Sequence, residues 1–263
     1  MKKIKVNDVE LAFRDEGAGK PIVFLHAFPL NQTMWDKQVA EFAPSYRIIT
    51  LDWRGFGESG LSATHSSLPV FADDLAELLN LLEIEKATIC GLSMGGYAAF
   101  AFYRQFAERV NALILCDTRA TADTEEGKQG RYEMAELART KGVSAIAEKM
   151  IPKLLGTTTL KDFPGAASHV RSMIEAAQPE GIAQALIGMA QRDDSTELLP
   201  GINCPTLIVV GDEDTLTPPS DAEKMAQTIP NSRLEIIPDA GHLSNLERPA
   251  SFNQAVRDFL NQF

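Results

Sequence analysis

A serine with a glycine two residues away on either side is the feature that most restricts how this chain folds. It stands in the segment GLSMG at residues 91–95, after an apolar run at 87–90 and before an alanine-rich segment at 96–102. This order predicts a strand, a sharp turn and a helix. A turn of this kind forces the serine into a strained backbone conformation and exposes its hydroxyl above a sheet. We therefore take Ser93 as a candidate nucleophile.

Short apolar runs recur along the chain, with helical intervals between them. Continuous runs rich in β-branched residues are typical of parallel strands that are covered on both faces. The first fifteen residues instead alternate around a predicted turn at Asn7 and Asp8, which is typical of an antiparallel hairpin at a sheet edge. The sequence thus predicts the α/β class, with a mostly parallel sheet of about eight strands flanked by helices. We assign internal strands to residues 21–25, 47–51, 87–90, 112–116, 206–210 and 234–237.

One interval is too long to be a simple crossover between neighbouring strands. From about residue 119 to about residue 196 the sequence contains helical patterns but no strand-like run, and Pro152, Pro164 and Pro179 separate these patterns. We predict a helical cap over residues 119–196. In this interpretation the cap is inserted into a core domain formed by residues 1–118 and 197–263.

A serine hydroxyl reacts poorly at neutral pH unless a base accepts its proton and an acid orients that base. The chain has only four histidines. His242 follows the last predicted strand, and a loop at this point reaches the carboxyl edge of the sheet, where the sites of open α/β folds lie. We therefore predict His242 as the base. We interpret His65, in a polar loop, and His169, in the predicted cap, as surface or packing residues.

The orienting acid is expected in the loop after the preceding strand, where three carboxylates compete. We choose Asp214 because it lies far enough into the loop to face His242. Asp212 is placed to hydrogen-bond the backbone of the turn, and Glu213 to face water. Asp117, at the end of the fourth internal strand, remains open as an alternative acid.

Attack on a carbonyl group also requires donors for the oxyanion that forms. The backbone N–H of Met94 stands at the start of the helix after the serine, where the helix dipole favours negative charge. The loop after the first internal strand supplies a second candidate, the N–H of Phe28, because Pro29 has no N–H to offer. We predict that these two N–H groups form an oxyanion hole and that His26 braces the loop.

Charge and composition limit the partners of the chain. Its formal net charge is −11 and no basic block interrupts the acidity, so nucleic acid and anionic membranes are expected to be repelled. No apolar stretch approaches the length of about 18 residues that suggests a membrane span, and no signal-peptide core follows the basic start of the chain. We therefore expect a cytoplasmic protein. The sequence leaves its oligomeric state open.

Several of these segments together resemble the α/β-hydrolase superfamily. The segments are LHAFPL at 25–30, LDWRGFGES at 51–59, GLSMGG at 91–96, GDEDTLTP at 211–218 and AGHLSNLERP at 240–249. Within the superfamily the chain is most similar to esterases, 3-oxoadipate enol-lactonases and cofactor-free haloperoxidases. The resemblance implies an α/β-hydrolase fold, with Ser93 as nucleophile, Asp214 as acid and His242 as base. It also implies that no metal and no organic cofactor takes part.

The triad and the resemblance lead to one main hypothesis of function. The protein hydrolyses a small-molecule carboxylic ester or lactone with a small to medium acyl group, through an acyl-enzyme on Ser93, with perhydrolysis as a side activity. Serine at this position argues against dehalogenases and epoxide hydrolases of the same fold, which need a carboxylate there, but not against C–C bond hydrolases. Two alternatives remain: a 3-oxoadipate enol-lactonase specifically, or a ligand sensor that keeps the triad and acts through a protein partner.

Substrate selection is expected to depend on the cap. Its apolar side chains offer a flexible, methionine-rich wall that suits small or medium acyl groups. We name Met150, Phe163 and Met189 of the cap as pocket residues. Outside the cap we add Leu243, beside the base, and Trp53, after the second internal strand. Each of these five side chains could instead serve only to pack the structure.

Overall fold

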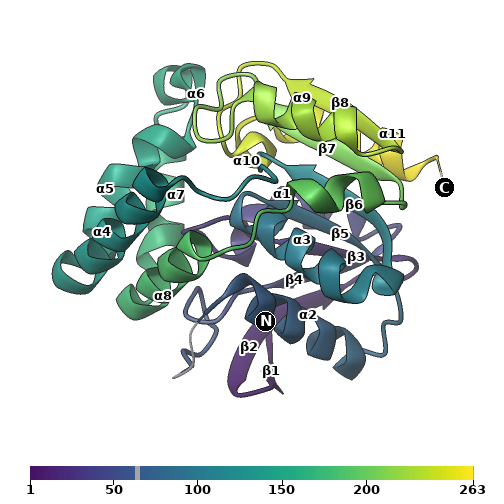
Figure 1. Ribbon diagram of the computed structural model, residues 1–263, viewed down its shortest axis with the longest axis horizontal. Coiled ribbons are helices and arrows are strands. Elements are labelled where there is room, and N and C mark those ends of the chain that lie inside the picture. Colours follow the sequence, from purple (N-terminus) through teal and green to yellow (C-terminus); the bar gives the residue numbers. More distant parts are fainter. Residues whose placement is uncertain (63–65, 263) are drawn as a thin grey trace.

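The computed structural model describes residues 1–62 and 66–262, and eight strands within them form a single sheet (Figure 1). The strand order is β1-β2-β4-β3-β5-β6-β7-β8. The pairs β1–β2 and β2–β4 are antiparallel, and all other neighbouring strands are parallel. The strands are β1 (Lys2–Val6), β2 (Val9–Glu16), β3 (Pro21–Leu25), β4 (Arg47–Leu51), β5 (Ala87–Leu92), β6 (Val110–Cys116), β7 (Thr206–Gly211) and β8 (Ser232–Ile237).

The predicted sheet is confirmed, including the hairpin at its edge, in which Val6 pairs with Val9 across the turn. The starts of two strands were predicted too late. Strand β6 begins at Val110 and β8 at Ser232. The first residues of the last strand, Ser232 and Arg233, were missed because this strand lies at the edge of the sheet, where only Ile237 is buried and polar side chains are tolerated.

Helices cover both faces of the sheet because the chain reverses its direction across it. It moves from β3 to β4 in one direction and from β4 through β5, β6 and β7 to β8 in the other. Since crossovers are right-handed, α1 lies on one face, and α2, α3 and α9 lie on the other. Helix α11 contacts α1, and α2 packs against α3. These helices are α1 (Asp36–Phe42), α2 (Leu68–Leu81), α3 (Met94–Phe106), α9 (Pro219–Thr228) and α11 (Pro249–Leu260).

Five helices occupy the interval between β6 and β7 and form a separate group beside the sheet (Figure 1). They contact mainly one another, with the pairs α4–α8 and α5–α7 in close contact. Helix α4 begins where the Thr124 side chain accepts a hydrogen bond from the N–H of Gly127 at 3.1 Å. The five are α4 (Glu125–Lys141), α5 (Val143–Leu154), α6 (Thr157–Asp162), α7 (Gly165–Glu175) and α8 (Pro179–Ala190).

The remaining helices are short. They comprise α10 (Ser244–Glu247) and the 3₁₀ turns η1 (Gln32–Trp35), η2 (Ala107–Arg109) and η3 (Thr196–Gly201). In the described part of the chain, no helix combines the length and the apolar character needed to cross a membrane.

The close approach of α3 to the sheet depends on glycine. A β-carbon placed on Gly95, in the first turn of α3, would lie 2.2 Å from the carbonyl oxygen of Leu25 in β3. This contact is between the backbone of the helix and the backbone of the strand, so no flexible side chain can move aside to make room for the methyl group. The helix that carries Ser93 at its amino end is therefore held directly against the strand that leads to the Phe28 loop.

We expect the substitution Gly95→Ala to lower the free energy of unfolding by about 1–3 kcal/mol or more, because the added methyl group overpacks the contact between α3 and β3. Chemical denaturation of the purified variant measures this loss. Gly130→Ala in α4 is the matched control: a β-carbon there meets no described atom within 4 Å outside its own helix. The control is expected to gain about 0.5–1 kcal/mol from helix propensity. Equal stability of the Gly95→Ala variant and the parent would contradict the close approach.

Candidate active site

Ser93 lies in the turn between β5 and α3 with a strained backbone. Its φ is 55° and its ψ −113°, a combination that residues with side chains rarely adopt. Gly91 allows the turn to be this tight, since a β-carbon there would lie 2.2 Å from the carbonyl oxygen of Gly95. The Ser93 N–H donates to the Cys116 carbonyl of β6 at 2.9 Å, and the Ser93 carbonyl accepts from the N–H of Gly96 at 2.9 Å. These contacts fix the serine in its strained conformation.

The structure brings together the three side chains that the sequence assigned to a triad. His242 Nε2 lies 2.8 Å from Ser93 Oγ, and His242 Nδ1 lies 2.8 Å from Asp214 Oδ2. Asp214 and His242 are buried, and Ser93 is partly accessible. Because Nδ1–H donates to the carboxylate, the neutral imidazole keeps a lone pair on Nε2 that can accept the hydroxyl proton of Ser93.

Asp214 is held by its own loop. Its Oδ1 accepts hydrogen bonds from the N–H groups of Leu216, at 2.8 Å, and Thr217, at 3.1 Å. Its Oδ2 accepts one from the Thr217 hydroxyl at 2.7 Å. Burial raises the pKa of this carboxyl, but the charge and hydrogen bond of His242, together with the bonds from Thr217, outweigh burial, so the pKa lies below its ordinary value. The carboxylate is therefore charged and fixed in orientation.

The pKa of His242 is set by the same two opposing effects, burial and the charge of its partner. Burial alone lowers the pKa of its imidazole, but the negative charge and the hydrogen bond of Asp214 outweigh burial and raise the pKa above its ordinary value of 6.5. The imidazole is thus a stronger base than an exposed histidine. A base of this kind, hydrogen-bonded to a hydroxyl, is what activation of a serine requires.

Asp117, the alternative acid, lies close to the triad but is used differently. Its Oδ1 accepts from the N–H of Gly211 at 2.9 Å, and its Oδ2 accepts from the hydroxyl of Ser244 at 2.5 Å. Within the described residues it makes no hydrogen bond to His242. Burial, with the nearby charge of Asp214, raises the pKa of Asp117 well above its ordinary value. The geometry therefore favours Asp214 over Asp117 as the partner of His242.

The loop after β3 is braced by His26. The N–H of Trp53 donates to His26 Nε2 at 3.0 Å, so Nδ1 carries the proton and donates to the Ala27 carbonyl at 2.9 Å. Burial lowers the pKa of His26, which keeps the ring neutral. The Phe28 N–H makes no hydrogen bond to any described residue. Met94 is the first residue of α3, where helix N–H groups have no partner within the helix.

A sequence model of the family described as alpha/beta hydrolase fold matches residues 20–249. The chain belongs to the α/β-hydrolase fold family. The fold predicted from the resemblance is thereby confirmed.

Esterases and enol-lactonases are among the relatives of this α/β hydrolase. It is 30% identical to 3-oxoadipate enol-lactonase 2 of Acinetobacter baylyi over 99% of this chain and 96% of the relative. A thermophilic esterase from Thermogutta terrifontis, solved with malate bound, matches with a TM-score of 0.97 and 45% identity over 100% of this chain and 99% of the esterase. The enol-lactonase from Burkholderia xenovorans matches with a TM-score of 0.92 and 30% identity over 99% and 100% of the two chains.

A cavity of about 110 Å³ opens beside Ser93 and His242 in this α/β hydrolase. Its apolar wall consists of Phe28, Met150, Met189 and Leu216. Two of the predicted cap residues, Met150 and Met189, thus lie at the cavity. The polar part of the wall consists of Tyr97, Arg119, Arg131 and Thr217.

The other three predicted pocket residues lie elsewhere. Trp53 is fully buried and stacks on Phe71, with ring centroids 4.6 Å apart. Leu243 is fully buried, and its N–H donates to Glu247 at 3.1 Å. Phe163 is 56% exposed and lines a separate groove of about 470 Å³ between the cap and α1.

The remaining histidines, His65 and His169, were predicted to be surface or packing residues. His169 lies on α7 and lines the same groove as Phe163, away from Ser93. His65 lies outside the described residues. Among residues 1–62 and 66–262, no group of three or more His, Cys, Asp or Glu side chains could hold a metal ion.

The sequence analysis missed the polar part of the cavity wall. A signal for two of its residues was present. Tyr97 follows Ser93 by four residues, about one helical turn, and Arg119 lies three residues after the end of β6, at the carboxyl edge of the sheet. Arg131 carried no such signal because it reaches the cavity from α4, and the packing of the cap cannot be deduced from strand order.

We expect the pKa of His242 to lie above 6.5 in the parent protein and to fall in Asp214→Asn, because the substitution removes the largest charge that opposes burial of the imidazole. NMR titration of the histidine ring nitrogens measures both values. Asp212→Asn is the matched control, since Asp212 is exposed in the same loop. An unchanged pKa in Asp214→Asn, or a fall of similar size in the control, would show that Asp214 does not govern this imidazole.

Proposed function

We propose that this protein hydrolyses carboxylic esters or lactones with small to medium acyl groups, through an acyl-enzyme formed on Ser93. The observation that carries the proposal is the pair of 2.8 Å contacts that join Ser93 Oγ to His242 and His242 to Asp214. Esterase and enol-lactonase relatives that align over nearly the whole chain support the same class of reaction.

In the first half of the reaction, Ser93 Oγ attacks the carbonyl carbon of the substrate while its proton passes to His242 Nε2. The imidazolium that forms is stabilised by Asp214 and then donates its proton to the leaving alkoxide. The C–O bond of the ester breaks and leaves the acyl group on Ser93. In the second half, His242 removes a proton from water, which attacks the acyl-enzyme and releases the acid.

The negative charge on the carbonyl oxygen during both steps requires donors. We assign this role to the N–H groups of Met94 and Phe28. Met94 stands at the amino end of α3, where the helix dipole favours an anion. Phe28 lies at the cavity on a loop that His26 braces. Loss of one such donor typically lowers turnover by about 10²–10³-fold.

The volume of the cavity limits the substrate. A space of about 110 Å³ beside Ser93 suits an acyl group of a few carbon atoms better than a long chain. Met150 and Met189 supply flexible apolar contact to it.

A second candidate is 3-oxoadipate enol-lactonase activity. It is favoured by 3-oxoadipate enol-lactonase 2 of Acinetobacter baylyi, and the enol-lactonase of Burkholderia xenovorans supports enol-lactone hydrolysis more generally; each is 30% identical to this chain. Assay of the enol-lactone beside simple aryl esters and unsubstituted lactones separates this narrower function from a general esterase.

We expect Ser93→Ala to lower kcat for short p-nitrophenyl esters by about 10⁶-fold, because the nucleophile is removed. Its melting temperature should remain close to that of the parent. A fluorophosphonate probe should label the parent at Ser93 and leave the variant unlabelled. Ser251→Ala, at an exposed position of α11, is the control that keeps full activity.

Activity that survives in Ser93→Ala would refute the nucleophile assignment. A single turnover without further product, together with a rise of the melting temperature on adding the ligand, would instead support the ligand sensor.

A further inference from the structure

The cavity at Ser93 contains positive charge as well as the triad. Arg119 follows β6 in the core and Arg131 lies on α4 in the cap, and both line this cavity. Ester hydrolysis itself needs no guanidinium group, because the oxyanion is stabilised by N–H donors. The presence of Arg119 and Arg131 in the cavity wall is therefore not explained by ester hydrolysis alone.

Both arginines belong to a cluster around a single carboxylate, that of Asp123. Arg119 Nη2 lies 2.7 Å from Asp123 Oδ1, and Arg192 Nη1 lies 2.7 Å from Asp123 Oδ2. Arg131 Nε also donates to Asp123. Burial raises the pKa of Asp123, but the bonds and charges of Arg192 and Arg131 outweigh burial and hold the pKa far below its ordinary range. The carboxylate is therefore charged.

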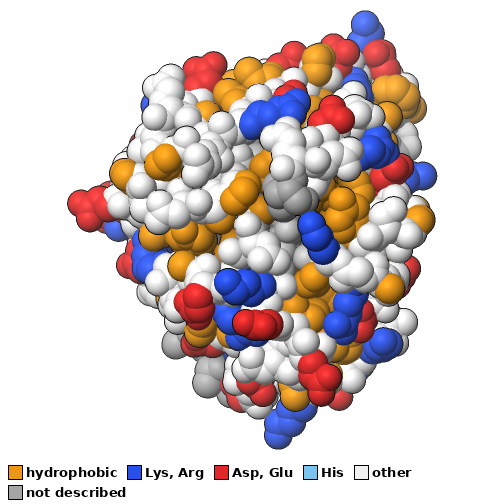
Figure 2. All heavy atoms as spheres, turned by 90° about the vertical axis from the view of Figure 1, so that its right-hand side faces the viewer, with side chains coloured by type: hydrophobic (Ala, Val, Ile, Leu, Met, Phe, Trp, Pro, Cys, Tyr) orange, Lys and Arg blue, Asp and Glu red, His pale blue; other side chains and the backbone are white. Residues whose placement is uncertain are grey.

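This cluster is not electrically balanced. Three guanidinium groups share the carboxylate of Asp123. The exposed carboxylate of Asp194 also interacts with the charge of Arg192, which leaves one positive charge of the cluster without an opposite charge. Asp221 is the other carboxylate that raises the pKa of Arg119, but it forms its own ion pair with Lys224 at 3.3 Å. The chain as a whole is acidic: its net charge is −11, and the face drawn in Figure 2 shows basic side chains scattered among acidic ones.

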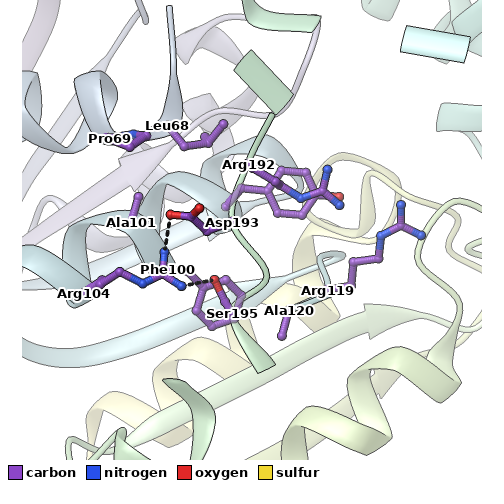
Figure 3. A pocket seen from close by; sticks show the side chains of 11 residues that line it. Leu68, Pro69, Phe100, Ala101, Arg104, Arg119, Ala120, Arg192, Asp193 and Ser195 are labelled. Carbon is purple, nitrogen blue, oxygen red and sulfur yellow. Dashed lines mark hydrogen bonds and ion pairs between the residues drawn. The ribbon is translucent and has the colours of Figure 1, made fainter. Parts of the chain in front are cut away.

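Arg119 also has a hydrogen-bond donor that is not used within the described part of the protein. Its Nε is buried, and among the described residues it has no hydrogen-bond partner. A buried donor without a partner is costly. Figure 3 shows the guanidinium groups of Arg119 and Arg192 turned away from the Arg104–Asp193 ion pair of the adjoining pocket. Arg192 lies over the Tyr97 ring at 4.2 Å, so its charge adds to the field on this side.

We propose that Arg119 and Arg131 form a carboxylate-binding subsite of the Ser93 cavity, so that the preferred substrates are esters or lactones whose acyl portion carries a free carboxylate. This inference rests on the proposed function. The half-esters of short dicarboxylic acids represent the class. Guanidinium groups suit the subsite because they match a carboxylate in shape and charge, and a carboxylate would balance the excess positive charge.

A purely structural role of the cluster explains less. Arg192 has a side chain that is 5% exposed and already binds Asp123. Arg192 is therefore enough to attach the end of α8 to Asp123, without Arg119 or Arg131. The further cations repel one another, and their position at the cavity wall costs stability unless an anion is bound there at least during the reaction.

The test compares two matched substrates. Monoethyl succinate carries the carboxylate, and ethyl succinamate replaces it with a neutral amide of nearly the same shape. We expect the parent to prefer the carboxylate in kcat/KM by at least about 10-fold, and added salt to weaken this preference. Succinate is expected to inhibit hydrolysis of the neutral ester competitively, and succinamide much less.

In Arg119→Gln and Arg131→Gln we expect most of this preference to be lost, because a lost charge-assisted hydrogen bond typically costs a factor of about 10 or more. kcat/KM for the amide ester should fall much less than kcat/KM for the carboxylate ester, because the neutral amide makes no ion pair with either guanidinium group. Arg119→Lys and Arg131→Lys should restore part of the preference. Arg139→Gln is the matched control: Arg139 lies on α4 and pairs with Glu180 at the surface, so the preference should not change.

Three outcomes would overturn the subsite. These are a parent that hydrolyses both esters equally, glutamine variants that lose both activities to the same extent, and a parent that succinate does not inhibit. In each case hydrolysis of the neutral ester by the parent leaves the proposed function intact. If no ester is hydrolysed, the proposed function fails, and calorimetric binding of succinate to the parent still decides whether the subsite exists. If a variant does not fold, calorimetric binding of succinate to the parent again decides whether the subsite exists.

Discussion

The strained backbone at Ser93 is the constraint on which the rest of the site depends. A residue with a positive φ can persist only where its surroundings fix it. Here the fixing groups come from three strands: β5 leads into the turn, Cys116 of β6 accepts the Ser93 N–H, and Leu25 of β3 packs against Gly95. A central parallel strand has such neighbours on both sides, and an edge strand does not. A serine in this conformation therefore belongs in the middle of the sheet.

The same parallel arrangement explains where the partners of Ser93 come from. Parallel strands end at one edge, so the loops after β3, β7 and β8 meet the turn after β5. Burial there opposes charge on both Asp214 and His242, yet each lowers the cost of charging the other. The pair can thus carry a positive charge on the imidazole in a largely dry site. An exposed pair would interact much more weakly.

Residues whose position follows from the sheet were predictable from the sequence. Ser93, Asp214 and His242 each come shortly after an apolar run, and strand topology alone brings them to one edge. Trp53 and Leu243 also follow strands, but their side chains point into the protein, and a strand end does not specify which way a side chain turns. Phe163 and Arg131 depend on how the cap helices pack, for which the amino-acid pattern gives only the apolar faces. Their placement on the outer groove and at the cavity, respectively, needed the structure.

The charged cluster around Asp123 links the cavity to the attachment of the cap. Arg119 precedes the cap in the chain, Arg131 lies on its first helix and Arg192 follows its last helix. One buried carboxylate thus joins the exit of β6 to both ends of the inserted helices. A movement of α4 relative to the sheet would separate Arg131 from Asp123 and alter the charge that faces Ser93. The electrostatic character of the cavity and the position of the cap are therefore set by the same contacts.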